Sequence, residues 1–280
     1  MSSPAITSAS TEFLALVNVL ADAAGAESMR HFRMPLDIIT KADDSPVTLA
    51  DRAAETAMRA ILGAQRPADG IYGEEHGAER LDAEHVWVLD PIDGTRSFIT
   101  GSPLWGTLIG VLARDARAGD GTGRVVLGLI DMPVLGERWI GQAGIGAQRN
   151  GVAVQASQCS SVAQARIVTT SPDLFSADEL HAFDVLSKRC AMRRFGGDCY
   201  GYAQLAGGTI DLVVEAGLQP YDYLGPAGLI EAAGGVITDW RGRPLGLYSN
   251  GRVIAAATPA LHAQALVALR DVPEQSALVA

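Results

Sequence analysis

The sequence predicts a layered α/β protein in which two opening helices flank a first sheet and a second half alternates strands with helices. Three observations predict this fold class: helical spacing of apolar residues up to about residue 62, short apolar runs between Gly, Asp and Pro turns up to about residue 140, and alternation of the two patterns from about residue 155. With 280 residues, 48% of them hydrophobic, the chain is long enough to bury a large core.

The N-terminal half is predicted to span residues 11–154. Thr11 precedes apolar residues at helical spacing, which indicates a helix running to about Phe32, and a second helix is expected over 49–62. Residues 86–89 form a short apolar run that ends in an acidic turn, as a buried strand does. Further strands are expected at 104–112, 125–130 and 138–140.

The C-terminal half is predicted to span residues 155–270, and the two ends, 1–10 and 271–280, are expected to be flexible. Strands are expected at 167–169, 210–215 and 253–257. Helices are expected at 177–188, 200–206, 223–233 and 261–269. The alternation of the two kinds of element favours an α/β arrangement in this half.

Composition excludes several classes of function. A formal net charge of -10 argues against nucleic acid or an anionic membrane as the partner, although acids that hold metal ions would still permit an anionic substrate. The cysteines, Cys159, Cys190 and Cys199, are odd in number and lack CxxC spacing, so neither a disulfide framework nor a zinc knuckle is expected. No leader and no apolar stretch of about 20 residues is found, which predicts a cytoplasmic protein.

The segment 90–95 reads Asp-Pro-Ile-Asp-Gly-Thr and directly follows the predicted strand at 86–89. Pro91 stiffens the turn, so Asp90 and Asp93 can be aimed at one point, while Gly94 permits close approach of the backbone. Two neighbouring carboxylates repel unless a proton or a cation lies between them. Oxygen donors without His or Cys favour magnesium, manganese or calcium over zinc. The alternative is a solvated turn, which Asp and Gly favour anywhere.

Other acids also stand at the ends of predicted apolar segments. Glu74 follows the apolar pair at 71–72, Glu215 closes the strand at 210–215, and Asp222 lies in a turn before a helix. Each could be an ordinary loop acid. Together they favour one shared site, because open α/β sheets place ligands at strand ends.

Three motifs together resemble the inositol monophosphatase family over about residues 10–270. They are Gly-Glu-Glu at 73–75, Asp-Pro-Ile-Asp-Gly-Thr at 90–95, and Pro-Tyr-Asp at 220–222 with Glu-Ala-Ala-Gly-Gly at 231–235. The resemblance implies an αβαβα sandwich, a homodimer, a small phosphate-ester substrate and two or three Mg²⁺ ions per site, which Mn²⁺ could replace. It places Glu74, Asp90 and the Ile92 carbonyl on one ion and Asp90, Asp93 and Asp222 on a second, with Glu74 also near a third.

The same resemblance implies the catalytic roles. Thr95 and Asp51, together with Glu74, would help to deprotonate a metal-activated water that attacks phosphorus. The amides of Gly94 and Thr95 would hold phosphate oxygens. For Asp51 the alternative is an acid in the first turn of a helix, favoured by the dipole alone. Lys41 could approach the site or could be a solvated loop lysine.

Two segments are similar to the branch of the family that hydrolyses histidinol phosphate: 87–101 continuing into 103–110, and 194–202 together with 218–224. This substrate carries an ammonium and an imidazole, which Asp198 and Glu215 could bind through charge-assisted hydrogen bonds. Arg194 could contact phosphate or orient Asp198. The alternatives are a helix N-cap for Asp198 and an ordinary surface position for Arg194. The predicted substrate-binding residues are Asp93, Gly94, Thr95, Arg194, Asp198, Glu215 and Asp222.

Three other functions stay open at this stage. An inositol 1-phosphate phosphatase and a broad small-molecule phosphatase would use the same metal motif. A catalytically silent binding protein would keep the fold, although the presence of Thr95 and Asp51 beside the full ligand set speaks against it. Cys199 as a nucleophile is disfavoured, because no histidine lies near it in the sequence.

Overall fold

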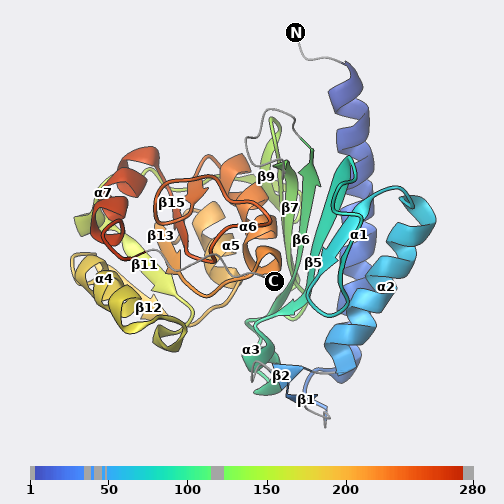
Figure 1. Ribbon diagram of the computed structural model, residues 1–280, viewed down its shortest axis with the longest axis horizontal. Coiled ribbons are helices and arrows are strands. Elements are labelled where there is room, and N and C mark those ends of the chain that lie inside the picture. Colours follow the sequence, from blue (N-terminus) through green and yellow to red (C-terminus); the bar gives the residue numbers. More distant parts are fainter. Residues whose placement is uncertain (1–3, 35–38, 41–45, 48, 115–122, 274–280) are drawn as a thin grey trace.

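The computed structural model describes residues 4–34, 39–40, 46–47, 49–114 and 123–273, and these form five layers in the order helix, sheet, helix, sheet, helix (Figure 1). Helices α1 (Pro4–His31) and α2 (Leu49–Gln65) cover the outer face of the first sheet. Helices α5 (Tyr200–Ala206) and α6 (Pro220–Ala232) lie between the sheets, and α4 (Ala177–Ser187) and α7 (Pro259–Leu269) cover the second. The predicted αβαβα sandwich is confirmed.

The first sheet has eight strands in the order β10-β9-β8-β7-β6-β5-β3-β4. Only β3 and β5 run parallel; every other neighbouring pair is antiparallel. All four strands predicted for this half are present, and β5 extends beyond the predicted run as far as Asp93. The bounds are β3 (Gly70–Gly73), β4 (Gly77–Glu79), β5 (His85–Asp93), β6 (Gly106–Ala113), β7 (Arg124–Met132), β8 (Glu137–Gln142), β9 (Gly146–Arg149) and β10 (Val152–Val154).

The second sheet has five strands in the order β12-β11-β13-β15-β14, with β11 parallel to both of its neighbours and the remaining pairs antiparallel. Its strands are β11 (Arg166–Thr169), β12 (Met192–Phe195), β13 (Leu212–Glu215), β14 (Val236–Thr238) and β15 (Val253–Ala256). The short elements β1 (Ile39–Thr40), β2 (Pro46–Val47), α3 (Thr95–Ile99), η1 (Val162–Gln164) and η2 (Pro172–Leu174) complete the described fold.

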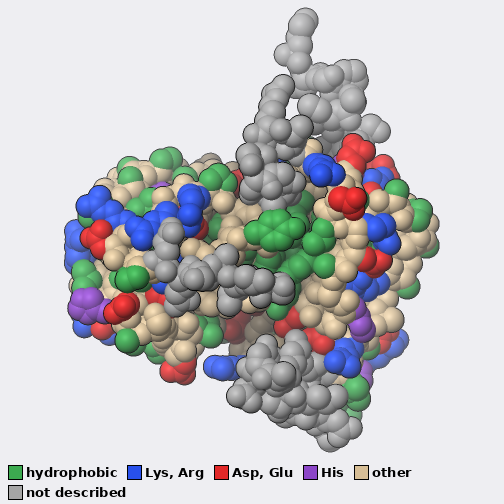
Figure 2. Space-filling model, in the orientation of Figure 1, with side chains coloured by type: hydrophobic (Ala, Val, Ile, Leu, Met, Phe, Trp, Pro, Cys, Tyr) green, Lys and Arg blue, Asp and Glu red, His purple; other side chains and the backbone are tan. Residues whose placement is uncertain are grey.

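Apolar side chains fill the spaces between the layers, and β5 shows how. Trp87 and Leu89 pack toward α1 and α2, whereas Val86 and Val88 pack into the cluster between the two sheets. Because successive strand residues point to opposite faces, a strand buried on both faces must be apolar throughout. Figure 2 shows hydrophobic side chains gathered between the two halves, with charged side chains spread over both flanks.

A row of glycines brings α6 unusually close to the first sheet. Gly110, Gly128 and Gly141 lie directly opposite one another on β6, β7 and β8. A Cβ atom on Gly128 would lie 2.0 Å from the carbonyl oxygen of Gly225 in α6, and one on Gly141 would lie 2.4 Å from the Cα atom of Leu229. Helix and sheet therefore meet backbone to backbone.

Three predicted helix starts differ from the structure, and the smallest difference is at α7, which begins at Pro259 instead of residue 261. Helix α1 begins at Pro4, so Thr11 lies inside the helix and does not cap it. Helix α6 begins at Pro220 instead of residue 223, because Gln219 caps it and proline is well tolerated in the first turn. In the described part of the chain, no helix has the length and apolar character needed to cross a membrane.

Candidate active site

A break in strand β5 sets the direction of the first two acids. Asp90 is paired with Leu108 and Asp93 with Gly106, so the register with β6 shifts between them. The hydroxyl of Thr107 donates a 2.8 Å hydrogen bond to the carbonyl oxygen of Pro91 and secures this irregular segment. Such bulges redirect side chains at sheet ends. The motif thus forms the end of a strand and not a solvated turn.

Asp222 reaches the same place from the second half of the chain. It is the third residue of α6, where its carboxylate accepts a 2.7 Å hydrogen bond from the amide of Gln219. Carboxylate oxygens of Asp90, Asp93 and Asp222 all lie within 4.8 Å of one another. Folding therefore brings together three acids that are separated by up to 132 positions in the sequence.

The environment of these acids fits a hard divalent cation. Asp90 is buried, and its Oδ1 atom has no hydrogen-bond partner among the described residues. Burial, and then the negative charges of Glu74, Asp93, Asp222 and Asp51, hold the pKa of Asp90 well above its usual value. Burial, followed by the charge of Asp93, likewise raises the pKa of Asp222. A cation among these oxygens would relieve the repulsion, and an all-oxygen donor set suits magnesium or manganese.

Asp93 is partly compensated by the protein. Its Oδ2 atom accepts a 2.6 Å hydrogen bond from the amide of Cys199. Even so, burial and the nearby charge of Asp198 raise the pKa of Asp93 to about 8. The Cys199 thiol is buried and its pKa is raised well above the usual value, mainly by burial, so it is poorly suited to act as a nucleophile.

Three further predicted residues lie around this cluster. Glu74 follows β3, and its amide donates a 3.2 Å hydrogen bond to the carbonyl oxygen of Leu89, next to Asp90. Asp51 is buried in the first turn of α2, close enough to contribute to the raised pKa of Asp90. The hydroxyl of Thr95 donates to the carbonyl oxygen of Ile92 at 3.2 Å. Cooperation between Thr95 and Asp51 stays a prediction.

One cavity of about 630 Å³ collects most of the predicted residues. It lies over the acids and receives side chains from α3, from the loops after β11 and β13, and from the start of α6. Asp51, Asp90 and Ile92 are buried and are not part of its wall. The predicted residues in its lining are Glu74, Asp93, Gly94, Thr95, Arg194, Asp198, Glu215 and Asp222.

Glu215 and Asp198 form the acidic side of this cavity. Glu215 is buried, and its Oε1 atom accepts hydrogen bonds from the amide (3.0 Å) and the hydroxyl (2.7 Å) of Thr170. Burial nevertheless raises the pKa of Glu215 to about 7. Asp198 accepts a 2.8 Å hydrogen bond from the hydroxyl of Ser97, and burial raises its pKa. Ser97 and Thr170 were not predicted, since no sequence pattern marks such tertiary donors.

Asp198 and Arg194 lie on opposite sides of the two glycines at 196–197, in the segment from β12 to α5. Asp198 has a left-handed backbone (φ 45°), and Cys199 is the residue that precedes α5, so Asp198 is not the helix N-cap. Arg194 lies exposed on the edge strand β12 and lines the cavity, but Ser97 is the residue that holds the Asp198 carboxylate. Lys41 lies outside the described residues.

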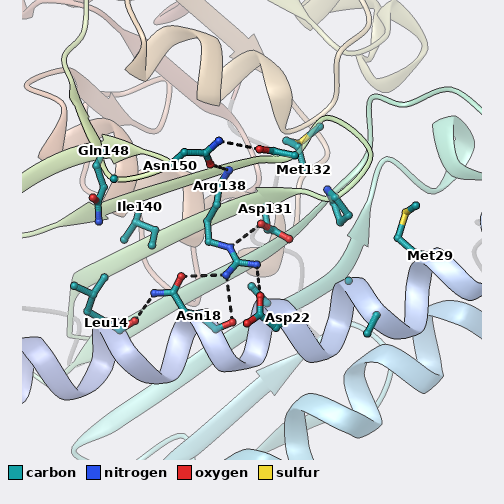
Figure 3. A pocket seen from close by; sticks show the side chains of 16 residues that line it. Leu14, Asn18, Asp22, Met29, Asp131, Met132, Arg138, Ile140, Gln148 and Asn150 are labelled. Carbon is teal, nitrogen blue, oxygen red and sulfur yellow. Dashed lines mark hydrogen bonds and ion pairs between the residues drawn. The ribbon is translucent and has the colours of Figure 1, made fainter.

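A second cavity, of about 650 Å³, lies between α1 and strands β7 and β8 (Figure 3). Its central cation, Arg138, donates to Asp131 at 2.7 Å and to Asp22 at 2.8 Å. Asn18 also accepts a hydrogen bond from Arg138, at 3.1 Å. These charges are satisfied within the protein, so this cavity offers no comparable reactive cluster.

Comparisons with known proteins agree with this geometry. Residues 10–274 match the model of the inositol monophosphatase family. The chain is 44% identical over 266 residues to a bifunctional phosphatase IMPL2, chloroplastic, of Arabidopsis thaliana, covering 92% of this chain and 75% of that protein. It is 36% identical to a histidinol-phosphatase of Chlorobaculum parvum, covering 88% and 92%. An inositol monophosphatase structure from Zymomonas mobilis superposes with a TM-score of 0.83 at 44% identity, covering 93% and 98%.

Proposed function

The chain belongs to the inositol monophosphatase family of phosphatases, and we propose that it hydrolyses L-histidinol phosphate to L-histidinol and phosphate with Mg²⁺ as cofactor. The observation that carries the substrate assignment is the acidic side of the cavity, formed by Asp198 and Glu215 beside the metal-ligand cluster. Two relatives support it, because those from Chlorobaculum parvum and Streptomyces coelicolor, 36% and 35% identical to this chain, are described as histidinol-phosphatases.

The metal ligands follow from the clustered oxygens. Asp90, Asp93 and Asp222 would hold one Mg²⁺, and Glu74 would join Asp90 and the Ile92 carbonyl oxygen on another. Bound cations would neutralise the phosphate and lower the pKa of the attacking water. The number of ions per site, two or three, is part of the proposal, and Mn²⁺ would be a suitable substitute because it accepts the same oxygen donors.

The remaining residues would bind the ester and move the proton. Gly94, with a φ of 83°, turns the chain from β5 into α3, and the amides of Gly94 and Thr95 would bind phosphate oxygens. Thr95 and Asp51 would accept the proton that leaves the attacking water. Arg194 would contact the phosphate from the edge of the cavity. These roles require no covalent intermediate on the protein.

The charge of the substrate would explain why Asp198 and Glu215 line the cavity. Histidinol phosphate carries an ammonium and an imidazole. The ammonium, placed beside Glu215, would favour the ionised form of the Glu215 carboxylate. In the described part of the chain no donor reaches Oε2 of Glu215, so that atom can accept from a ligand. A neutral polyol such as inositol gains less, because hydrogen bonds between charged partners are stronger by about twofold.

Phosphate release from histidinol phosphate and from inositol 1-phosphate, both with Mg²⁺, tests this proposal. We expect a higher kcat/KM for histidinol phosphate in the wild type. Glu215→Gln should lower that value by about tenfold or more, since charged hydrogen bonds contribute about 1.5–3 kcal/mol, and should affect inositol 1-phosphate less. Asp173→Asn is the matched control, because Asp173 is a nearby exposed acid outside the cavity lining.

A wild-type preference for inositol 1-phosphate would overturn the substrate assignment and would favour the inositol phosphatase alternative. The homodimer is also part of the proposal and rests on the family resemblance; light scattering should give twice the 29.3 kDa chain mass. The cytoplasmic location stays a prediction, since the Arabidopsis relative is described as chloroplastic.

A further inference from the structure

We propose that Glu55 is a positioning residue for the metal site, which it serves by fixing the turn that carries Glu74. The inference rests on the proposed function, since Glu74 must be a metal ligand for its position to matter. Glu55 lies on α2 one turn after Asp51, so the same face of this helix approaches both the cluster and the turn. Its side chain is completely buried.

The carboxylate of Glu55 binds the backbone immediately after Glu74. Its Oε2 atom accepts a 2.7 Å hydrogen bond from the amide of Glu75, and Oε1 accepts a 3.3 Å hydrogen bond from the amide of His76. The amide of Glu74 itself is bound to the carbonyl oxygen of Leu89 on β5. Glu74 is thus held between a strand on one side and a helical carboxylate on the other.

The residue before Glu74 confirms how closely Glu55 fits. A Cβ atom on Gly73 would lie 2.1 Å from Oε1 of Glu55, so the carboxylate occupies the space that any side chain at position 73 would need. Gly73 has an ordinary backbone conformation, since it is not among the positive-φ glycines. Glycine is therefore required here by the proximity of Glu55 and not by the shape of the turn.

Arg59 compensates the charge of Glu55. Its Nε atom donates a 2.7 Å hydrogen bond to Oε1 of Glu55, and its Nη1 atom donates a 2.8 Å hydrogen bond to Glu79. Arg59 also donates to the carbonyl oxygen of Gly77 on β4. A buried carboxylate is costly unless it is paired, and here the pairing comes from the side away from the metal cluster. Glu55 can therefore orient the turn without serving as a ligand.

Two substitutions separate positioning from mere stability. Glu55→Gln replaces one acceptor oxygen by an amide group that can only donate, so one of its backbone contacts is lost. Glu55→Asp keeps the charge but is one methylene too short to reach the turn. Glu79→Gln is the matched control, because it weakens the same arginine pair without touching the turn. Residues that orient metal ligands typically change metal affinity by about 10–100-fold.

The experiment measures Mn²⁺ binding calorimetrically without substrate, together with urea unfolding in EDTA. We expect the dissociation constant for Mn²⁺ to rise about tenfold or more in the two Glu55 variants and to stay unchanged in Glu79→Gln. The Mg²⁺ concentration that gives half-maximal activity should rise in parallel, while kcat recovers at saturating Mg²⁺. A purely structural residue would lower the urea midpoint and leave these metal constants unchanged.

The inference would be overturned if either folded Glu55 variant bound Mn²⁺ as tightly as the wild type. Failure of the proposed function looks different, because the wild type itself would then bind no Mn²⁺ or release no phosphate. If Glu55→Gln does not fold, Glu55→Asp decides the question, since it keeps a negative charge near Arg59.

Discussion

Replacing Gly128 with alanine should destabilise the protein by displacing α6 from the first sheet. The new Cβ atom would lie 2.0 Å from the carbonyl oxygen of Gly225 and 2.8 Å from the amide nitrogen of Leu229, whereas ordinary contacts begin at 3.4 Å. Both neighbours are backbone atoms, so no side-chain rotation can relieve the overlap. The helix itself would have to move by well over an ångström.

The magnitude follows from two opposing effects. Overpacking of a core costs about 1–3 kcal/mol, and a backbone clash belongs at the upper end of that range. Alanine in a strand recovers about 0.5–1 kcal/mol, because it loses less backbone entropy on folding than glycine. We therefore expect the free energy of unfolding to fall by about 2 kcal/mol.

Urea unfolding in EDTA measures this loss without a contribution from bound metal. Gly63→Ala in α2 is the matched control, since a Cβ atom there would meet nothing within 4 Å outside its own helical turn, and the substitution should stabilise by up to about 1 kcal/mol. Because Asp222 lies near the start of α6, Gly128→Ala should also weaken Mn²⁺ binding. An unfolding free energy within about 0.5 kcal/mol of the wild type would refute the reasoning.

Two other predictions concern the acids of the site. Asp93→Asn keeps an acceptor for the Cys199 amide but loses the charge, so we expect a folded protein with at least about tenfold weaker Mn²⁺ binding and nearly no turnover; full activity would contradict the role of Asp93. In the metal-free protein the pKa values of Asp93 (about 8) and Glu215 (about 7) are raised by burial above their usual 3.8 and 4.5. Because the folded state favours the protonated carboxyls, these two groups contribute their full stabilisation below about pH 4 and lose it as the pH rises through their folded pKa values of about 7 and about 8. The urea midpoint in EDTA should therefore fall as the pH is raised from about 4 to about 8. A midpoint that rises or stays constant there would contradict the pKa shifts.

Local signals in the sequence predicted much of the fold. Helix α5 spans the residues expected for it. Helix α4 begins at the predicted residue, after a capping box at Ser176, and ends one residue earlier than predicted. The strands β1 to β4, β9, β10, β12 and β14 were not predicted. These strands are two to four residues long, and β12 is exposed along its whole length, so it carries no alternation of apolar and polar residues.

The candidate site could be predicted only in part, for a related reason. Asp90, Asp93 and Asp222 stand in recognisable motifs, and the structure brings them together. Asp222 was expected in a turn, yet it belongs to α6, because its carboxylate closes a capping box with Gln219. The contact between Glu55 and the turn after β3 joins residues 20 positions apart across two elements, and no local pattern reveals such a contact.

The glycine row that seats α6 on the first sheet has a consequence for how such a phosphatase can change over time. Helix α6 contacts strands of the first sheet, β14 of the second, and α5 between them, so its backbone contact at the glycine row helps to set how the two sheets lie relative to each other. Side chains that line the cavity can then change to suit other phosphate esters, while the contact between α6 and the first sheet is kept. Diversification of substrates would accordingly concentrate in loops such as the one that carries Asp198, away from the contact between α6 and the first sheet.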